Sequence, residues 1–268
     1  MEPQPPRENM SDNLNHISEA VQVFELLNPN KKLETSTMFV GGCVRDHILS
    51  HPITDIDLAT VFHPEIVSEI LTNNKFNISK KFMNFGLISA ELNDVKFEIT
   101  TLREDVKPDG RYAKIVFTND WLLDAQRRDF TVNAIYYDML QSEQHKCFFD
   151  PYNGKSDLLD GKINFIKNCE ESINEDFVRV LRYFRFFLKY SKHEYNSNIL
   201  NSFFQNKEKI KKIKSNRMKN ELRKIVLTKN YRKILENENV REFFYFIYPD
   251  CEKFLSLDYE KALNFLDN

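Results

Sequence analysis

From Glu175 to its C-terminal end the sequence contains no glycine, and this change of composition divides the chain into two parts. The second part consists of long runs rich in Phe, Leu, Lys and Arg with apolar residues at helical spacing, which predicts an all-α structure. The first part, from about Thr37 to Phe165, has short β-rich runs broken by turns and two helices, after a helix expected over Ser18–Leu27. We therefore expect an α/β head, built as a sheet with flanking helices, followed by an all-α region.

Two local patterns in the first part predict strands that carry carboxylates. The segment Leu87–Thr100 reads as a β-hairpin, with LISAEL and VKFEIT joined by the turn pair Asn93-Asp94, and this places Glu98 on a strand. In DIDLAT, residues two apart point to the same side of a strand, so Asp55 and Asp57 present their carboxylates together.

These carboxylates have the chemistry of a magnesium site. Two like charges so close together repel unless a cation lies between them, and Mg²⁺ typically takes one or two protein carboxylates plus substrate phosphates. Asp55 and Asp57 are the expected ligands, and Glu98 is the natural third carboxylate for a two-metal phosphoryl transfer. Alone, a D-x-D pattern favours a solvated strand face or a turn anchor. The preceding GGCVRD reverses this preference, because its glycines let backbone amides approach a phosphate and Arg45 offers a bidentate cation.

The charge of the whole chain is uninformative, but one segment is strongly basic. The formal net charge is -2 with a pI near 6.3, so any nucleic-acid site must be a local patch. The lysine-dense segment 206–233 is the expected RNA contact, although a solvated helix face is the alternative. The residues expected to bind RNA are Lys211, Lys212, Lys214, Arg217 and Lys219.

Cysteine spacing and hydropathy favour a cytoplasmic protein. The four cysteines are scattered, without zinc-ligand or disulfide spacing, which fits a reducing environment. The N-terminal segment has neither the apolar stretch of a signal peptide nor the pattern of a transit peptide, and no segment is long and apolar enough to span a membrane. No oligomeric state follows from the sequence.

The motifs, taken in order, resemble the signature of the class II tRNA nucleotidyltransferase and bacterial poly(A) polymerase family. GGCVRD with DIDLAT is similar to its catalytic motif, FEITTLRED to its third-carboxylate strand and RRDFTVNAIYYD to its ribose and triphosphate motif. DPYNGKSDLLDGKI resembles its hinge, EDFVRVLRYFRF its nucleotide-templating helix, and SNRMKNELRKIV, from Ser215, its neck segment. The resemblance runs from about Phe39 to Val226.

This resemblance implies an enzyme that adds CCA to the 3′ ends of tRNA from CTP and ATP, without a nucleic-acid template and with Mg²⁺ held by Asp55 and Asp57. The residues expected to bind the incoming nucleotide are Gly41, Gly42, Arg45, Arg128, Asp129, Asn133, Asp176, Arg179, Arg182 and Arg185. Asp129 and Asn133 could instead hold each other at the start of a helix. The last four members of the list recur every three residues, which keeps them on neighbouring turns of one helix face.

Two of the implied roles are specific. Asp176 and Arg179 are expected to read the Watson–Crick edge of the nucleotide, because cytosine and adenine share an amino group that a carboxylate accepts from. The loop Arg103–Phe117, with its Pro-Asp-Gly turn, is expected to switch the pocket from CTP to ATP; an ordinary surface hairpin is the alternative.

KFMNFGLISAEL and the loop region resemble the alphaproteobacterial and mitochondrial CCA-adding branch. A poly(A) polymerase, a CC-adding or A-adding enzyme, and a non-catalytic RNA-binding relative are the other possibilities. The expected divisions are a disordered tail over 1–17, a head over 18–165, a helical neck over 166–228 and a truncated helical body over 229–268. The short C-terminal region has two interpretations, a compact enzyme or a fragment of a longer one.

Overall fold

The computed structural model of the chain describes residues 14, 17–29, 35–106, 114–141 and 147–267. The chain divides into two compact units, Met1–Ser156 and Asp157–Asn268, each with its own buried core. In these described ranges, no helix has the length and apolar character needed to cross a bilayer.

Unit 1 is built on a mixed sheet, which within the described residues has seven strands in the order β3-β4-β5-β2-β1-β8-β9. The central strands β2 and β5 run parallel, and the other described neighbours in this sheet run antiparallel. A separate hairpin pairs β6 with β7. The strands are β1 Thr37–Val40, β2 Asp55–Thr60, β3 Asn77–Ser79, β4 Leu87–Leu92, β5 Val95–Thr101, β6 Arg103–Val106, β7 Lys114–Phe117, β8 Tyr136–Tyr137 and β9 Phe148–Phe149.

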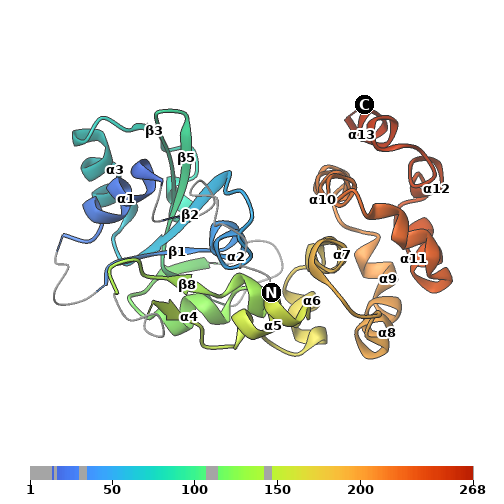
Figure 1. The fold of residues 1–268 in the computed structure, drawn as a ribbon. Coiled ribbons are helices and arrows are strands. Elements are labelled where there is room, and N and C mark those ends of the chain that lie inside the picture. The colour runs from blue at the N-terminus through green and yellow to red at the C-terminus, as the bar shows by residue number, and fades with distance from the viewer. Residues whose placement is uncertain (1–13, 15–16, 30–34, 107–113, 142–146, 268) are drawn as a thin grey trace, which may run out of the picture. The chain divides into compact units, whose positions relative to one another are not determined.

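Helices flank this sheet, as expected from the sequence. Figure 1 shows α1 and α3 beside each other next to the β3–β5 region, and α3 contacts β3, β4 and β5. The helices of unit 1 are α1 Ser18–Leu26, α2 Gly42–Ile48, α3 Pro64–Asn73 and α4 Trp121–Gln126, with 3₁₀ turns over Met83–Phe85 and Thr131–Asn133; the boundary between the two units falls within α5 Gly154–Asp160. Within the segment 1–17, which is expected to form a disordered tail, Leu14 is described and is fully buried.

The predicted hairpin is confirmed as β4 and β5, joined by Asn93 and Asp94. Both turn residues have positive φ, 49° and 65° respectively, which is the backbone that a tight two-residue hairpin turn requires and that Asn and Asp tolerate. The hairpin fixes the register of β5, so that Phe97 and Ile99 are buried while Glu98 points to the opposite face. Glu98 therefore lies on a strand at the centre of the sheet.

The described elements of unit 2 from α6 onward are all helices, as the helical runs after Glu175 predicted. Its longest helices are α7 Val178–Tyr190 and α10 Ser215–Leu227, which contact each other. Helix α7 buries Leu181, Phe184 and Leu188, at helical spacing, against a core rich in aromatic rings. The other elements are α6 Cys169–Glu175, α8 Ser197–Gln205, α9 Lys207–Ile210, the 3₁₀ helix Tyr231–Glu236, α11 Glu238–Ile247, α12 Cys251–Phe254 and α13 Tyr259–Asp267. The prediction of an α/β head followed by an all-α region is thus confirmed.

Candidate active site

Three carboxylates lie on the two parallel strands at the centre of unit 1. Asp57 on β2 is directly opposite Glu98 on β5, and Asp55 is opposite Lys96. Ile56 and Leu58, which alternate with the aspartates, are buried on the other face. The alternation of β2 therefore gathers the carboxylates on one face of the sheet.

The environment of Asp57 disfavours its negative charge. Burial raises the pKa of this carboxyl to about 6, and the neighbouring charge of Glu98 acts in the same direction. The guanidinium of Arg45 and the backbone N–H of Gly42 oppose this effect without cancelling it. Burial and the neighbouring Glu98 thus disfavour ionised Asp57, and a bound cation would offset this cost.

The glycine turn wraps closely around the carboxylate of Asp57. Gly41 has a φ of 77°, and a Cβ placed on it would lie 3.0 Å from Oδ2 of Asp57. Both the left-handed backbone and the lack of space therefore require glycine at this position. Gly42 begins α2, and its N–H donates to Asp57. The turn that was predicted to face a phosphate positions the central carboxylate in this structure.

Arg45, Asp129 and Asn133 form one chain of hydrogen bonds. The Arg45 side chain is almost fully buried, and its Nη1 donates to Asn133 Oδ1 and to the carbonyl oxygen of Val132, the latter at 3.3 Å. Asn133 Nδ2 donates to Asp129 Oδ1 at 2.7 Å, and the N–H of Phe130 donates to the same oxygen at 3.0 Å. Of the two possibilities raised for Asp129 and Asn133, the structure has them holding each other.

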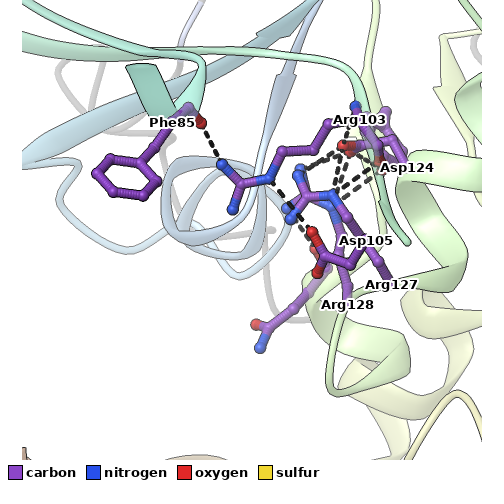
Figure 2. A network of polar contacts seen from close by, with 8 residues as sticks. Phe85, Arg103, Asp105, Asp124, Arg127 and Arg128 are labelled. Atoms are coloured by element: carbon purple, nitrogen blue, oxygen red, sulfur yellow. Dashed lines mark hydrogen bonds and ion pairs between the residues drawn. The ribbon is translucent and has the colours of Figure 1, made fainter. Parts of the chain in front are cut away.

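A second cluster gathers arginines around Asp124, which is fully buried (Figure 2). Arg127 Nη2 and Arg128 Nη2 donate to its two carboxylate oxygens at 2.6 and 2.9 Å, and the hydroxyl of Tyr136 donates at 2.7 Å. Burial alone would raise the pKa of Asp124, but the charges of Arg128 and Arg127 outweigh it and hold the pKa well below its usual range. The backbone N–H of Arg103 also points to Asp124, at 3.4 Å.

Sequence reasoning identified only Arg128 in this cluster. Asp124 and Arg127 were not identified. The spacing in WLLDAQRRDF could have indicated them, because residues three and four apart on a helix are neighbours and Asp124 pairs with Arg127 and Arg128. Arg103 was considered only as part of a loop. Its role depends on a contact with Phe85, far away in the sequence, which no local pattern indicates.

The carboxylates and the arginines meet in one cleft of unit 1. This open cleft has a volume of about 370 Å³ and brings together negative, positive and aromatic side chains. The residues relevant to the site are Asp57, Phe82, Phe85, Glu98, Thr100, Arg103, Arg127 and Arg128. A cleft with a perturbed carboxyl group and converging cations is the expected surrounding of a phosphoryl-transfer centre.

The predicted nucleotide-reading residues lie in unit 2, around the start of α7. Asp176 lies two residues before the helix, accepts from the N–H of Val178 and pairs with Arg217 at 2.7 Å. Arg179 pairs with Glu175 at 2.7 Å. These two residues therefore have protein partners in this structure, and the Asp176–Arg217 pair is solvent-exposed.

The two remaining arginines of the series pack on the same ring. Arg182 and Arg185 lie over Phe186, at 5.7 and 4.5 Å from its centroid, and Arg185 also pairs with Glu221 on α10 at 3.1 Å. The pair links α7 to α10, which lies within the basic segment 206–233. Of the predicted RNA-binding residues, Lys211, Lys212, Lys214 and Arg217 are exposed and Lys219 is half-buried.

A mixed sheet with paired carboxylates beside an arginine-lined cleft defines the head domain of a nucleotidyltransferase. Residues 37–164 match the family described as "Poly A polymerase head domain", and this region of the chain belongs to that family. Human mitochondrial CCA tRNA nucleotidyltransferase 1 is 35% identical over 190 residues, 70% of this chain and 43% of the relative. The CCA-adding enzyme of Staphylococcus epidermidis is 30% identical over 231 residues, 84% of this chain and 55% of the relative.

The fold is also similar to that of a solved structure. The Bacillus stearothermophilus CCA-adding enzyme in complex with CTP superimposes with a TM-score of 0.68 at 25% identity, covering 91% of this chain and 56% of that chain. The present chain thus spans about half the length, or less, of the curated relatives that it matches.

Proposed function

We propose that this chain is a template-independent RNA nucleotidyltransferase that adds CCA to the 3′ ends of tRNA from CTP and ATP. The observation that carries the proposal is the opposed pair Asp57 and Glu98 in a cleft that also holds Arg103, Arg127 and Arg128. The named activities of relatives that align with 70% and 84% of this chain support the choice of substrates.

The carboxylates of this site fit a divalent cation. Over the described residues no three His, Cys, Asp or Glu side chains are grouped as a preformed metal cage, but Mg²⁺ needs only one or two carboxylates when substrate phosphates complete its shell. Asp55 and Asp57 would hold Mg²⁺, with Glu98 as the third carboxylate. An ion held by these carboxylates would supply activation of the attacking 3′ hydroxyl and neutralisation of charge on the leaving pyrophosphate.

The arginines would orient the triphosphate. Arg103, Arg127 and Arg128 line the cleft, and Asp124 and Tyr136 fix the position of Arg128. Guanidinium groups that are already oriented bind phosphate oxygens with little loss of side-chain entropy. These arginines would then hold the triphosphate of the nucleotide near the carboxylates in a single orientation.

A direct assay tests the proposal. The chain, Mg²⁺ and tRNA lacking its 3′ CCA are incubated with CTP, ATP or both, and the products are sequenced. We expect CCA with both nucleotides and CC with CTP alone. A homopolymeric A tail identifies a poly(A) polymerase, addition of only C or only A identifies a partial enzyme, and no extension of a bound tRNA identifies a non-catalytic relative.

Nucleotide selection gives a second test, on Asp176 and Arg179. For these residues to read a base, Asp176 must exchange Arg217 for the nucleotide, which costs little because this pair is exposed. Asp176→Ala is expected to relax discrimination against UTP and GTP, by about 5- to 150-fold for a lost pair worth about 1 to 3 kcal/mol. The control, Arg217→Ala, frees Asp176 and should keep selectivity. A variant at Asp176 as selective as the parent would place the reading elsewhere.

Three further predictions stay open. The loop Arg103–Phe117 is described only at its base, β6 and β7, and its predicted tip, Lys107–Arg111, lies outside the described residues. The neck over 166–228 and the body over 229–268 stay proposals within unit 2. A cytoplasmic location also stays a prediction, and the names of three relatives place those proteins in mitochondria.

A further inference from the structure

Two phenylalanine rings are exposed at the cleft that contains Asp57 and Glu98. Phe82 is 45% exposed and Phe85 is 55% exposed, and both line the cleft. Phe82 directly precedes the 3₁₀ turn Met83–Phe85, in which residues three apart lie on the same side. Large aromatic side chains that stay in solvent beside a polar cleft are typical of a binding surface.

The turn that carries these rings is held in place by the base of the β6–β7 hairpin. Arg103 Nη1 donates to the carbonyl oxygen of Phe85, and Figure 2 shows the ring of Phe85 projecting away from the arginine cluster. The next residue, Gly86, has a φ of 80°, and a Cβ placed on it would lie 2.8 Å from Cε1 of Phe117. Arg103 and Phe117 are paired with each other across the hairpin. The rings are therefore presented on a preorganised turn, which reduces the entropy lost on binding.

Cationic side chains lie near the rings, and this indicates the chemistry of the partner. Nζ of Lys81 lies 5.3 Å from the centroid of Phe82, and Lys80 is exposed next to it. Arg103 and Arg127 line the same cleft. Aromatic rings beside lysines and arginines match a single-stranded nucleic acid, whose bases stack on the rings while its phosphates meet the cations.

We propose that Phe82 and Phe85 form a stacking surface for the 3′-terminal base of the RNA that is extended, an inference that rests on the proposed function. Stacking on a ring accepts any base, which suits an RNA end whose last base is not the same at all three additions. The incoming nucleotide instead needs selection by hydrogen bonds, and its proposed readers are Asp176 and Arg179. The RNA end bound on this surface lies beside Asp57 and Glu98, where its 3′ hydroxyl must react.

A double-mutant cycle with the RNA tests the contact directly and without catalysis. The dissociation constant is measured by fluorescence anisotropy for a 5′-labelled tRNA that ends in CC, and for the same tRNA with an abasic 3′-terminal nucleotide. Phe85→Ala is expected to weaken binding of the intact tRNA by about 5- to 150-fold. Removal of the base should raise the dissociation constant of the wild type by a similar factor. Phe85→Ala combined with the abasic tRNA should raise it little more than either change alone.

Matched variants separate stacking from other effects. Phe85→Trp should restore binding, and Leu122→Ala should leave it unchanged, because Leu122 is a comparable side chain, 49% exposed, that does not line the cleft. Additive losses in the cycle, or unchanged binding by both Phe82→Ala and Phe85→Ala, overturn the proposal, as does absence of any binding to wild type. A higher KM for ATP with unchanged RNA binding also overturns it, because the rings then hold the incoming nucleotide. If binding depends on Phe85 but wild type extends no RNA, the stacking surface stands and the proposed function fails.

Discussion

Replacement of Asp57 by asparagine is expected to abolish nucleotide addition and, at the same time, to stabilise the metal-free protein at neutral pH. The carboxyl of Asp57 has a pKa of about 6 in the fold, against about 3.9 in an unfolded chain. Ionised Asp57 therefore costs folding free energy above pH 6, and asparagine has the same shape without the charge. Loss of the carboxylate should lower the rate of addition by about a thousandfold or more, since metal-assisted catalysis supplies several kcal/mol.

The pH dependence follows from the raised pKa. A proton on Asp57 stabilises the fold fully below about pH 4, and this stabilisation is lost as the pH rises through about 6. Thermal unfolding in EDTA should therefore give nearly equal midpoints for Asp57→Asn and wild type at pH 4. The advantage of the variant should grow up to pH 6 and then level off at about 1 to 3 kcal/mol. Added Mg²⁺ should reduce the difference by stabilising the wild type.

Asp55 offers a matched control on the same face of β2. It is exposed and lies opposite Lys96, so Asp55→Asn should lose nucleotide addition without gaining stability. Near wild-type addition by either variant would contradict the proposed metal site. Unchanged stability of Asp57→Asn in EDTA at pH 7 would show instead that the charge of Asp57 is neutralised within the protein.

The second large effect is expected at Asp124, a residue that was not among the site residues predicted from the sequence. Asp124→Asn leaves Arg127 and Arg128 without their shared charge partner and turns an amide N–H₂ towards guanidinium donors. Breaking such a buried pair costs about 3 to 5 kcal/mol, measured as a lower urea midpoint at unchanged slope. Because the pKa of Asp124 is lowered, its contribution is present above about pH 4 and declines as the solution is acidified, so the difference between the two proteins should shrink in acid.

A functional readout separates a positioning role from simple loss of stability. At a temperature where both proteins are folded, Asp124→Asn should weaken binding of ATP by about tenfold or more, for loss of one charge-assisted contact, and leave binding of adenosine unchanged. Asp120→Asn, four residues earlier, is the control, because asparagine also caps helix α4. Equal weakening of ATP and adenosine would indicate a general distortion of the cleft.

Local patterns predicted the features that depend on local chemistry. The Asn93-Asp94 turn predicted the hairpin, the period of two placed Asp55 and Asp57 on one face, and the helical spacing after Glu175 predicted the helices of unit 2. The register that sets Asp57 against Glu98 could not be predicted, because parallel pairing joins segments that are distant in the sequence. The same holds for the contacts of Asp176 with Arg217 and of Arg103 with Phe85, because each joins residues that come together only when the unit folds.

The parallel pairing of β2 with β5 also bears on the order in which the protein folds. Between these strands the chain must complete helix α3 and the strands β3 and β4, so the contact between Asp57 and Glu98 closes a long loop and carries its entropic cost. The β4–β5 hairpin can form early from neighbouring residues, whereas the carboxylate pair belongs to the slow, non-local step. We therefore expect Asp57 and Glu98 to approach each other late in folding, when other contacts of the sheet have formed and can offset the repulsion between them.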